Sequence, residues 1–308
     1  MNNLLNQVET QINQLIKGKS EQVRLALICL LAEGHLLIED APGLGKTTLA
    51  RAISASTSST FRRIQFTPDL MPSDITGVSV YHQTTSEFVF HPGPIFANFV
   101  LADEINRASP RTQSAMLEVM AETTVTYDGI SHQISRPFMV LATQNPVEMD
   151  GTYQLPEAQL DRFLMRISLG YPDRESEYQI LRMQEDNDQF FKFKQIASPE
   201  DLNTLIQSVH QVHASNSIIN YIVNLIGKTR EHPDIRLGCS PRASIGLLRS
   251  AKAMAYMEGR QHVLPSDVIN LVQPVLAHRI IVGAKGNTFQ IVDEILSQVS
   301  VPPGDLRP

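Results

Sequence analysis

Short apolar runs alternate with amphipathic segments along the first half of the chain. Runs of four to six mostly apolar residues predict strands at 35–38, 61–66, 99–102, 138–143 and 164–169. Apolar positions at helical spacing predict helices at 20–33, 46–57, 110–122 and 156–163. Short strands that alternate with helices are typical of a parallel sheet covered on both faces. The sequence therefore predicts a three-layer α/β domain with a parallel five-stranded sheet.

Two segments interrupt this alternation and have the pattern of β-hairpins. Residues 76–90 carry alternating positions on both sides of a polar turn. Residues 122–135 contain Asp128-Gly129, a dipeptide that favours the tight turn between two antiparallel strands. We expect both hairpins to be insertions in the α/β domain.

The pattern changes near residue 197, after which the strands stop. Helical spacing predicts helices at 199–214, 217–231, 241–258 and 265–280. A polar stretch at 187–198 precedes them. We therefore divide the chain into an α/β core, residues 1–196, and a small all-α domain, residues 197–308.

The composition is that of an ordinary globular protein, with 42% hydrophobic and 19% charged residues in a chain of 308. No window approaches the ~18 uninterrupted apolar residues that a membrane span needs, which favours a cytoplasmic protein. The two cysteines, Cys29 and Cys239, lie in different predicted domains. We expect two buried thiols rather than a disulfide framework or a zinc site.

The segment between the first predicted strand and helix 46–57 has the pattern of a phosphate-binding loop. Its candidate nucleotide contacts are Pro42, Gly43, Leu44, Gly45, Lys46, Thr47 and Thr48. The glycines let backbone N–H groups approach phosphates, Lys46 is expected to bridge the β- and γ-phosphates, and the Thr47 hydroxyl suits Mg²⁺. The pattern departs at its first glycine, where Asp40 stands, although Gly43 and Gly45 still supply the turn. A chance match in a surface loop is the alternative.

Polar residues follow two further predicted strands. Asp103 and Glu104 end the run 99–102, where one carboxylate can support Mg²⁺ and the next can activate water. A solvated loop start is the alternative for such a pair. Asn145 follows the run 138–143 and can contact the attacking water or the γ-phosphate; the alternative is a turn former before Pro146.

Two arginines are candidates for stabilising charge on the γ-phosphate, an effect worth roughly 10³- to 10⁵-fold in rate. Arg162 ends the predicted helix 156–163, and Arg242 begins the helix 241–258. An exposed ion-pairing residue is the alternative for each.

The segments DAPGLGKTT, FVLADEINRA, LATQNP, QLDRFLM and SPRA resemble, in order and spacing, Walker A, Walker B, sensor 1, the arginine finger and sensor 2 of AAA+ ATPases. The segments QFTPDLMPSDITG, PGPIF, NRASPRTQSAMLEVMAE and QNPVEMDGTYQLPEAQLDRF are similar, more narrowly, to the MoxR family. This resemblance spans roughly residues 12–283. It implies a helix-2-insert AAA+ core with a helical lid, in which the two hairpins are the helix-2 insert and the pre-sensor-1 hairpin and face the pore of a ring.

The resemblance also implies a role for each motif residue. Lys46 and Thr47 would bind phosphates and Mg²⁺, Asp103 would support Mg²⁺, Glu104 would be the catalytic base, and Asn145 would be sensor 1.

For residues further from the loop, the resemblance implies that Arg162 reaches the ATP of the neighbouring subunit and that Arg242 senses the γ-phosphate from the lid of its own subunit. Ile16 and Gly18 resemble the segment that packs against adenine. Arg166, Arg107 and Arg111 are alternative finger or interface arginines. Gln65, at the end of a strand, is a candidate partner of Glu104 that gates its activity.

These features predict an ATPase that assembles into a hexameric ring, binds ATP and Mg²⁺, and remodels or matures a partner protein. Within the resembled family the role extends to metal insertion, and the partner often carries a von Willebrand A domain, whose D-x-S-x-S sequence this chain lacks. A nucleic-acid motor is one alternative, but the net charge of −6 and the hairpin tip Tyr127-Asp128-Gly129, which lacks Lys and Arg, disfavour it. A nucleotide-dependent scaffold is another, disfavoured because both Asp103 and Glu104 are present.

Overall fold

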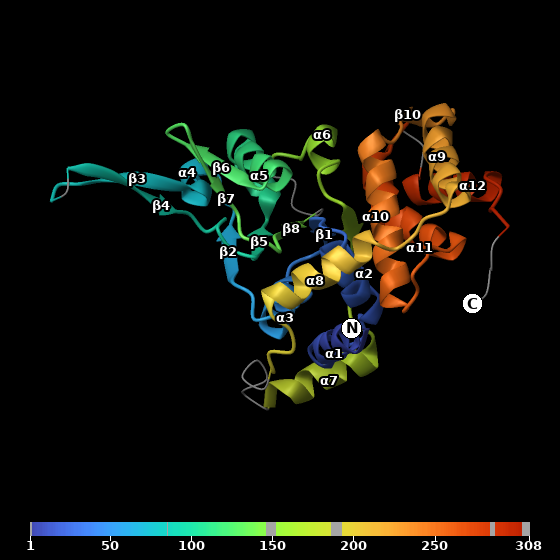
Figure 1. Ribbon diagram of the computed structural model, residues 1–308, viewed down its shortest axis with the longest axis horizontal. Helices are drawn as coiled ribbons and strands as arrows, with labels where there is room; N and C mark the ends of the chain where they lie inside the picture. Colours follow the sequence, from blue (N-terminus) through green and yellow to red (C-terminus); the bar gives the residue numbers. More distant parts are fainter. Residues whose placement is uncertain (1, 85, 146–151, 186–192, 284–286, 304–308) are drawn as a thin grey trace.

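The computed structural model describes residues 2–84, 86–145, 152–185, 193–283 and 287–303. Its centre is a five-stranded sheet with the strand order β2-β5-β8-β1-β9 (Figure 1). The strands are β1 (Leu36–Glu39), β2 (Phe61–Gln65), β5 (Phe99–Asp103), β8 (Met139–Gln144) and β9 (Met165–Ile167). All neighbouring strands run parallel. The predicted parallel five-stranded sheet is therefore confirmed.

Helices cover both faces of this sheet, which gives the expected three layers. The helices that belong to the core are α1 (Asn2–Leu15), α2 (Ser20–Leu31), α3 (Lys46–Ser56) and α5 (Pro110–Glu122). In β1, Leu36 and Ile38 join a hydrophobic cluster with α1, α2 and α3, whereas Leu37 joins the cluster that contains α5. Because both of their faces are buried, the inner strands β1, β5 and β8 are nearly continuous apolar runs rather than alternating ones.

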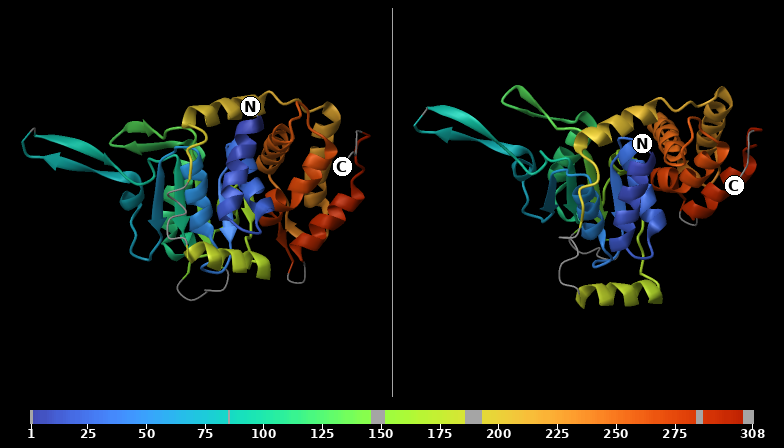
Figure 2. Two further views of the ribbon diagram at one scale, coloured as in Figure 1. Left: turned by 90° about the horizontal axis from the view of Figure 1, so that it is seen from below. Right: turned by 60° about the horizontal axis from the view of Figure 1, so that its bottom comes forward.

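Both predicted hairpins are present. The first pairs β3 (Gly77–His82) with β4 (Glu87–Pro92), and the second pairs β6 (Thr124–Tyr127) with β7 (Ile130–Gln133). Asp128 and Gly129 both have positive φ, 49° and 76°, as a tight hairpin turn requires. The two hairpins project from the same end of the molecule, away from the C-terminal helices (Figures 1 and 2).

The C-terminal part is mainly helical: its first helix lies along the core, and the remaining helices pack at the end of the molecule opposite the hairpins (Figure 2). Its helices are α8 (Pro199–His210), α9 (Asn216–Glu231), α10 (Pro241–Met257), α11 (Pro265–Leu276) and α12 (Thr288–Gln298). The expectation that strands end near residue 197 was wrong in one detail, because β10 (Ile235–Leu237) pairs antiparallel with β11 (Ile281–Val282). Strands of two or three residues are too short to show a period in the sequence.

Other differences concern elements with weak apolar signals. Helix α1 is rich in Asn and Gln, and helix α7 (Arg174–Glu185) leaves most of its residues exposed. Neither was predicted, nor were α12 and the short α4 (Pro72–Thr76). The predicted helix 156–163 is reduced to α6 (Glu157–Leu160).

Residues 187–192 of the predicted boundary, and residues 146–151 after Asn145, lie outside the described residues. Cys29 and Cys239 are buried free thiols, as expected. Among the helices that the structure describes, none is long and apolar enough for a membrane crossing.

Candidate nucleotide-binding site

Lys46, Asp103, Glu104 and Asn145 all lie at or beyond the carboxyl ends of neighbouring parallel strands. The register pairs Ile38 of β1 with Thr143 of β8, and β5 flanks β8 on its other side. The N–H of Asp40, directly after β1, donates to the carbonyl of Gln144 at 3.1 Å. The phosphate-type loop, the acidic pair and Asn145 therefore lie together at the carboxyl edge of the sheet, which is formed by the carboxyl ends of its strands.

The loop after β1 has the backbone conformation that its glycines suggested. Gly43 and Gly45 have φ of 83° and 90°, and a Cβ at either position would meet no atom within 4 Å. Glycine is therefore required by the left-handed backbone rather than by crowding. Helix α3 begins at Lys46 immediately after the second glycine, so the loop presents a helix N-terminus together with a cationic side chain.

The Lys46 ammonium lies near three carboxylates. Its Nζ donates to the carbonyls of Asp40, at 2.7 Å, and Ala41, at 3.2 Å. Partial burial lowers the pKa of Lys46, while the charges of Asp40, Asp103 and Glu104 act in the opposite direction and favour the ammonium. The lysine and the acidic pair therefore belong to one electrostatic site.

Asp40, which replaces the first glycine of the motif, has a structural role. Asp40 as a whole is only 6% exposed. It accepts hydrogen bonds from the Ser168 hydroxyl at 2.7 Å, the Gly170 N–H at 3.1 Å and the Leu169 N–H. These donors follow β9, so Asp40 fastens the start of the loop to the neighbouring strand. The donors satisfy a buried carboxylate that would otherwise be costly.

Thr143 organises the acidic pair, although the sequence did not single it out. Its hydroxyl donates to Asp103 Oδ1 at 2.6 Å and accepts the N–H of Glu104 at 2.8 Å. The side chain is fully buried. Glu104 has a left-handed conformation, with φ 55° and ψ 50°, which is unfavourable for a residue with a side chain. The hydrogen bond from Thr143 helps to hold this backbone.

Side chains from β2 contact both carboxylates. Arg63 donates to Asp103 Oδ2 from Nη2 at 2.6 Å and from Nε at 3.1 Å. Gln65 Nε2 donates to Glu104 Oε2 at 2.9 Å, so the expected contact between these two residues is present. Arg107, considered above as a finger, instead donates to Glu104 Oε2 at 3.0 Å. Arg63 was missed because a charged residue on a strand edge gives no motif signal.

The segment expected to pack against adenine is connected to the loop. Ile16 is buried, and Gly18 has a φ of 67° and lies against the start of α7. A Cβ at Gly18 would approach the Ser176 hydroxyl to 2.3 Å. Lys19 Nζ donates to the carbonyl of Tyr171 at 2.9 Å. Since Tyr171 follows Gly170, a partner of Asp40, a short chain of contacts joins this segment to the phosphate-type loop.

The oxygen ligands at this edge suit Mg²⁺ and a nucleotide phosphate. Thr47 offers a hydroxyl and Asp103 a carboxylate, and Mg²⁺ is commonly bound by one or two such protein oxygens together with phosphate oxygens. Within the part of the chain that the structure describes, no group of three or more His, Cys, Asp and Glu is arranged so that it could hold a metal ion. The donor set therefore fits a nucleotide-bound Mg²⁺ better than a metal held by protein alone.

Arg162 lies at the opposite edge of the sheet, the amino edge, which is formed by the amino ends of the strands. It precedes β9, and the neighbouring Leu164 N–H donates to the carbonyl of His35, which precedes β1, at 2.8 Å. Arg162 Nη1 donates to the carbonyl of Leu117 in α5 at 2.6 Å. The half-buried Arg162 therefore belongs to the amino edge, away from Lys46.

Arg242 is at the same amino edge. Asp161 accepts hydrogen bonds from Arg242 Nη1 at 3.4 Å, Ser240 Oγ at 2.9 Å and the buried Arg279 Nε at 2.9 Å. Arg242 therefore lies beside Asp161 and near Arg162, and its role as a sensor of the γ-phosphate stays a prediction. The C-terminal helix α10 delivers it there.

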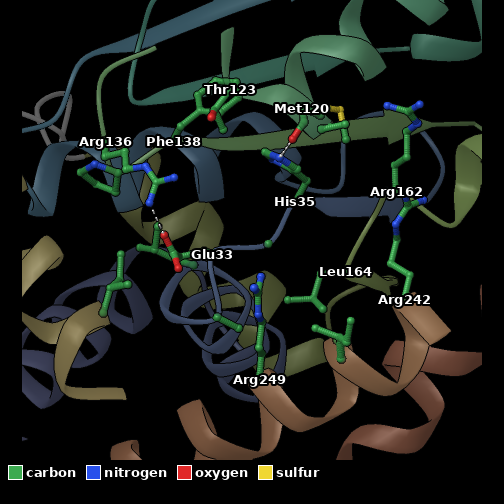
Figure 3. A pocket seen from close by; sticks show the side chains of 18 of the residues that line it. Glu33, His35, Met120, Thr123, Arg136, Phe138, Arg162, Leu164, Arg242 and Arg249 are labelled. Carbon is green, nitrogen blue, oxygen red and sulfur yellow. Dashed lines mark hydrogen bonds and ion pairs between the residues drawn. The ribbon is translucent and has the colours of Figure 1, made fainter. Parts of the chain in front are cut away.

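A cavity of about 490 Å³ opens at this edge between α8, α10 and the sheet. Arg162, Arg242 and Arg249 are among the residues that line it, and Figure 3 shows Arg242 and Arg249 extending from the C-terminal helices toward the sheet, with Arg162 beyond Arg242. None of the residues of the loop 40–48 line it. Two other finger candidates lie elsewhere: Arg166 pairs with Glu39 at 3.1 Å, and Arg111 is exposed at the start of α5.

Comparisons with known proteins agree with this arrangement. Residues 35–165 match the ATPase family associated with various cellular activities (AAA), and residues 227–298 match an AAA lid domain. The chain is 49% identical over 304 residues to the uncharacterised protein YeaC of Bacillus subtilis, covering 97% of this chain and 95% of that protein. It is 40% identical over 296 residues to Chaperone MoxR1 of Mycobacterium tuberculosis, covering 93% and 78%. A crystal structure of a candidate ATPase from Cytophaga hutchinsonii matches with a TM-score of 0.91 at 38% identity, covering 97% of this chain and 95% of that one.

Proposed function

The chain belongs to the MoxR family of AAA+ ATPases, and we propose that it hydrolyses ATP to remodel or mature a partner protein. The observation that carries this proposal is the sharing of one sheet edge by Lys46, Asp103, Glu104 and Asn145. A phosphate-binding loop, a metal-supporting carboxylate, a candidate base and a polar strand tip are the parts that nucleotide hydrolysis requires.

Each residue at this edge has a distinct task in the proposal. Residues 42–48 bind the phosphates through backbone N–H groups and the Lys46 ammonium. Thr47 and Asp103 would hold Mg²⁺, which neutralises negative charge on the phosphates when bound. Glu104 accepts a proton from the attacking water, and Asn145 contacts that water or the γ-phosphate. Ile16 and Gly18 pack against adenine.

The second part of the proposal is that hydrolysis requires a neighbouring subunit. Strand β1 has four residues, so about 13 Å of strand separates the two edges. Arg162 at the amino edge therefore serves the ATP of an adjacent copy in a homo-oligomeric, hexameric ring. We propose that Arg242 also contacts the ATP of the adjacent copy rather than that of its own subunit, because Asp161 holds Arg242 beside Arg162.

The hairpins connect the nucleotide site to a partner. Strand β2, which carries Gln65, continues through α4 into β3, and β7 continues toward β8, which ends beside Asn145. We propose that the Gln65–Glu104 contact gates hydrolysis and that movements at the site shift both hairpins.

The chemistry of the first hairpin favours a protein partner over nucleic acid. Residues 77–92 contain no Lys or Arg. The exposed side chains there include Val80, Tyr81 and Phe88, the last 71% exposed. Apolar and aromatic side chains are enriched at protein interfaces, whereas a phosphate backbone needs cations. We further propose that the partner is a protein with a von Willebrand A domain and that the outcome of remodelling is metal insertion. The proposed location is the cytoplasm, which supplies ATP.

Substitution of the candidate base tests the proposal directly. Glu104→Gln should bind ATP, hydrolyse it far more slowly than wild type, and retain its protein partner for identification by mass spectrometry. Lys46→Ala is the matched control and should lose ATP binding and partner retention together. A wild-type protein whose slow nucleotide turnover is unaffected by Glu104→Gln would instead be a nucleotide-dependent scaffold.

A further inference from the structure

Arg63 contacts the carboxylate that the proposed function assigns to Mg²⁺, yet no motif includes it. Both of its bonds, 2.6 Å from Nη2 and 3.1 Å from Nε, end on the same atom, Asp103 Oδ2. The other oxygen, Oδ1, accepts the Thr143 hydroxyl at 2.6 Å. The guanidinium is thus the partner of the one Asp103 oxygen that Thr143 does not use.

This contact competes with a metal ion for physical reasons. A carboxylate oxygen has two lone pairs, and two N–H donors occupy both of them. A guanidinium beside Asp103 also repels a divalent cation that approaches the same carboxylate. Asp103 Oδ2 therefore becomes available to Mg²⁺, or to a water bound by Mg²⁺, only when Arg63 moves away.

Arg63 is placed so that it can move. Strand β2 is at the edge of the sheet, and the Arg63 side chain is 50% exposed, whereas that of Asp103 is 13% exposed. An exposed guanidinium can be released into water at small cost, since ion pairs of this kind are weak. The carboxylate stays in position because Thr143 holds it from the buried side.

Gln65 links the release of Asp103 to that of Glu104. Its Oε1 accepts Arg63 Nη2 at 2.6 Å, and its Nε2 donates to Glu104 Oε2 at 2.9 Å. Arg63 and Gln65 lie two residues apart and therefore on the same face of β2. One movement of this strand therefore removes the β2 contacts of both carboxylates together, while Arg107 still contacts Glu104.

We propose that Arg63 is a positioning residue that withholds Asp103 from Mg²⁺ until β2 moves, so that metal binding and loss of the Gln65–Glu104 contact occur in one step. The inference rests on the proposed ATPase function. Strand β2, which leads into the β3–β4 hairpin, would then control the binding of Mg²⁺ at Asp103.

The test is the Mg²⁺ dependence of nucleotide binding, measured with a fluorescent, non-hydrolysable ATP analogue over a series of Mg²⁺ concentrations. Arg63→Ala should lower the Mg²⁺ concentration at the midpoint by about fivefold, the ratio that an exposed ion pair corresponds to. Arg63→Lys should give an intermediate midpoint, because an ammonium lacks the paired geometry of the guanidinium. It also keeps a charge on the strand if the alanine variant is unstable.

Arg62→Ala is the matched control, since Arg62 is exposed on the opposite face of the same strand and forms no ion pair with a residue that the structure describes. Its midpoint should equal that of wild type. An unchanged or higher Mg²⁺ midpoint in folded Arg63→Ala would overturn the inference and leave the ATPase proposal standing. Wild-type protein that binds the analogue with no Mg²⁺ dependence would overturn both.

Discussion

Lys46 and Arg162 lie at opposite edges of one parallel sheet. Lys46 begins the helix that follows the carboxyl end of β1, and Arg162 precedes the amino end of β9, the strand paired with β1. Arg162 is held there by the carbonyl of Leu117, on an element that packs against the other face of the sheet. The chain therefore places the proposed phosphate-binding loop and Arg162 at opposite edges of the sheet, which is the arrangement that the proposed head-to-tail ring would require.

The first prediction is that two inactive variants restore each other. Arg162→Ala should hydrolyse ATP roughly 10³-fold more slowly than wild type, because it lacks the charge that stabilises the transition state. Glu104→Gln should be slow because it lacks the base. Mixed at equal concentrations, the two should regain measurable turnover, since some interfaces join an intact Glu104 to an intact Arg162.

If Arg162 acted on the ATP of its own subunit, neither variant would contain a complete site. The mixture would then hydrolyse ATP as slowly as each variant alone. Arg166→Ala with Glu104→Gln tests the alternative finger in the same assay. Arg62→Ala is the control for the loss of an arginine charge, because Arg62 is exposed and does not line the cavity.

The second prediction concerns Thr143, which bridges the acidic pair. Thr143→Val removes one hydrogen bond to the Asp103 carboxylate and leaves the Glu104 N–H without its acceptor. We expect kcat to fall by about tenfold, the effect of losing a hydrogen bond to a charged group. ATP affinity should change little because the loop 42–48 is intact. Thr143→Ser, which retains the hydroxyl, should stay near wild type; a loss in Thr143→Ser as large as that in Thr143→Val would show that the hydroxyl's hydrogen bonds do not account for the effect.

The third prediction is that removing the Gln65 amide releases the base. Gln65→Ala removes one of the two hydrogen bonds that described side chains donate to the Glu104 carboxylate, and the bond from Arg107 remains. Basal hydrolysis should rise by about fivefold, a change of about 1 kcal/mol for one exposed hydrogen bond to a carboxylate. Gln65→Asn is the conservative comparison. A slower basal rate in Gln65→Ala would mean that the amide orients Glu104 for catalysis rather than restraining it.

The sequence was sufficient to predict the sheet, the hairpins and the phosphate-type loop, because each has a strong local signal. Apolar runs define buried parallel strands, Asp128-Gly129 defines a hairpin turn, and Gly43 with Gly45 defines a left-handed loop. These signals depend on neighbours in the chain, so no knowledge of tertiary contacts was needed.

The rest of the site depends on contacts between distant segments. Arg63 contacts Asp103, which is 40 positions later in the chain. Asp40 contacts Ser168 and Gly170, which are 128 and 130 positions later. The position of Arg242 depends on how α10 packs against Asp161, which no local pattern specifies. Helices α1 and α7 escaped prediction for another reason: polar residues dominate both, and tertiary packing rather than periodicity stabilises them.

The fourth prediction is that an aromatic contact makes the two hairpins move as one. The Phe90 ring stacks on His132 with centroids 4.4 Å apart and lies 5.6 Å from Tyr127. Phe90→Ala removes contacts worth about 0.5–1.5 kcal/mol, so amide exchange over residues 124–133 should quicken by about three- to tenfold. Phe88→Ala, on the same strand but 71% exposed, is the control. Equal acceleration in both variants would show that the hairpins are not coupled through Phe90.

The last prediction uses His35, which is buried just before β1. Its Nδ1 accepts the Val140 N–H at 3.0 Å, so the neutral ring donates from Nε2 to the Met120 carbonyl, also at 3.0 Å. Burial lowers the pKa of His35 from 6.5 to about 4. The unfolded imidazole takes up a proton as the pH falls through about 6.5, whereas the folded one stays neutral until about 4.

His35 therefore contributes stability that is fully present above pH 6.5 and is lost progressively toward pH 4. Between pH 7.5 and pH 5 its share of the loss in unfolding free energy should be about 2 kcal/mol. Burial also lowers the pKa of His278, which acts in the same direction, so the comparison must be with a variant. His35→Gln can accept from Val140 and donate to Met120 without titrating. In urea unfolding at the two pH values, its stability should fall by about 2 kcal/mol less than that of wild type, whereas equal losses would mean that His35 is already protonated in the folded protein.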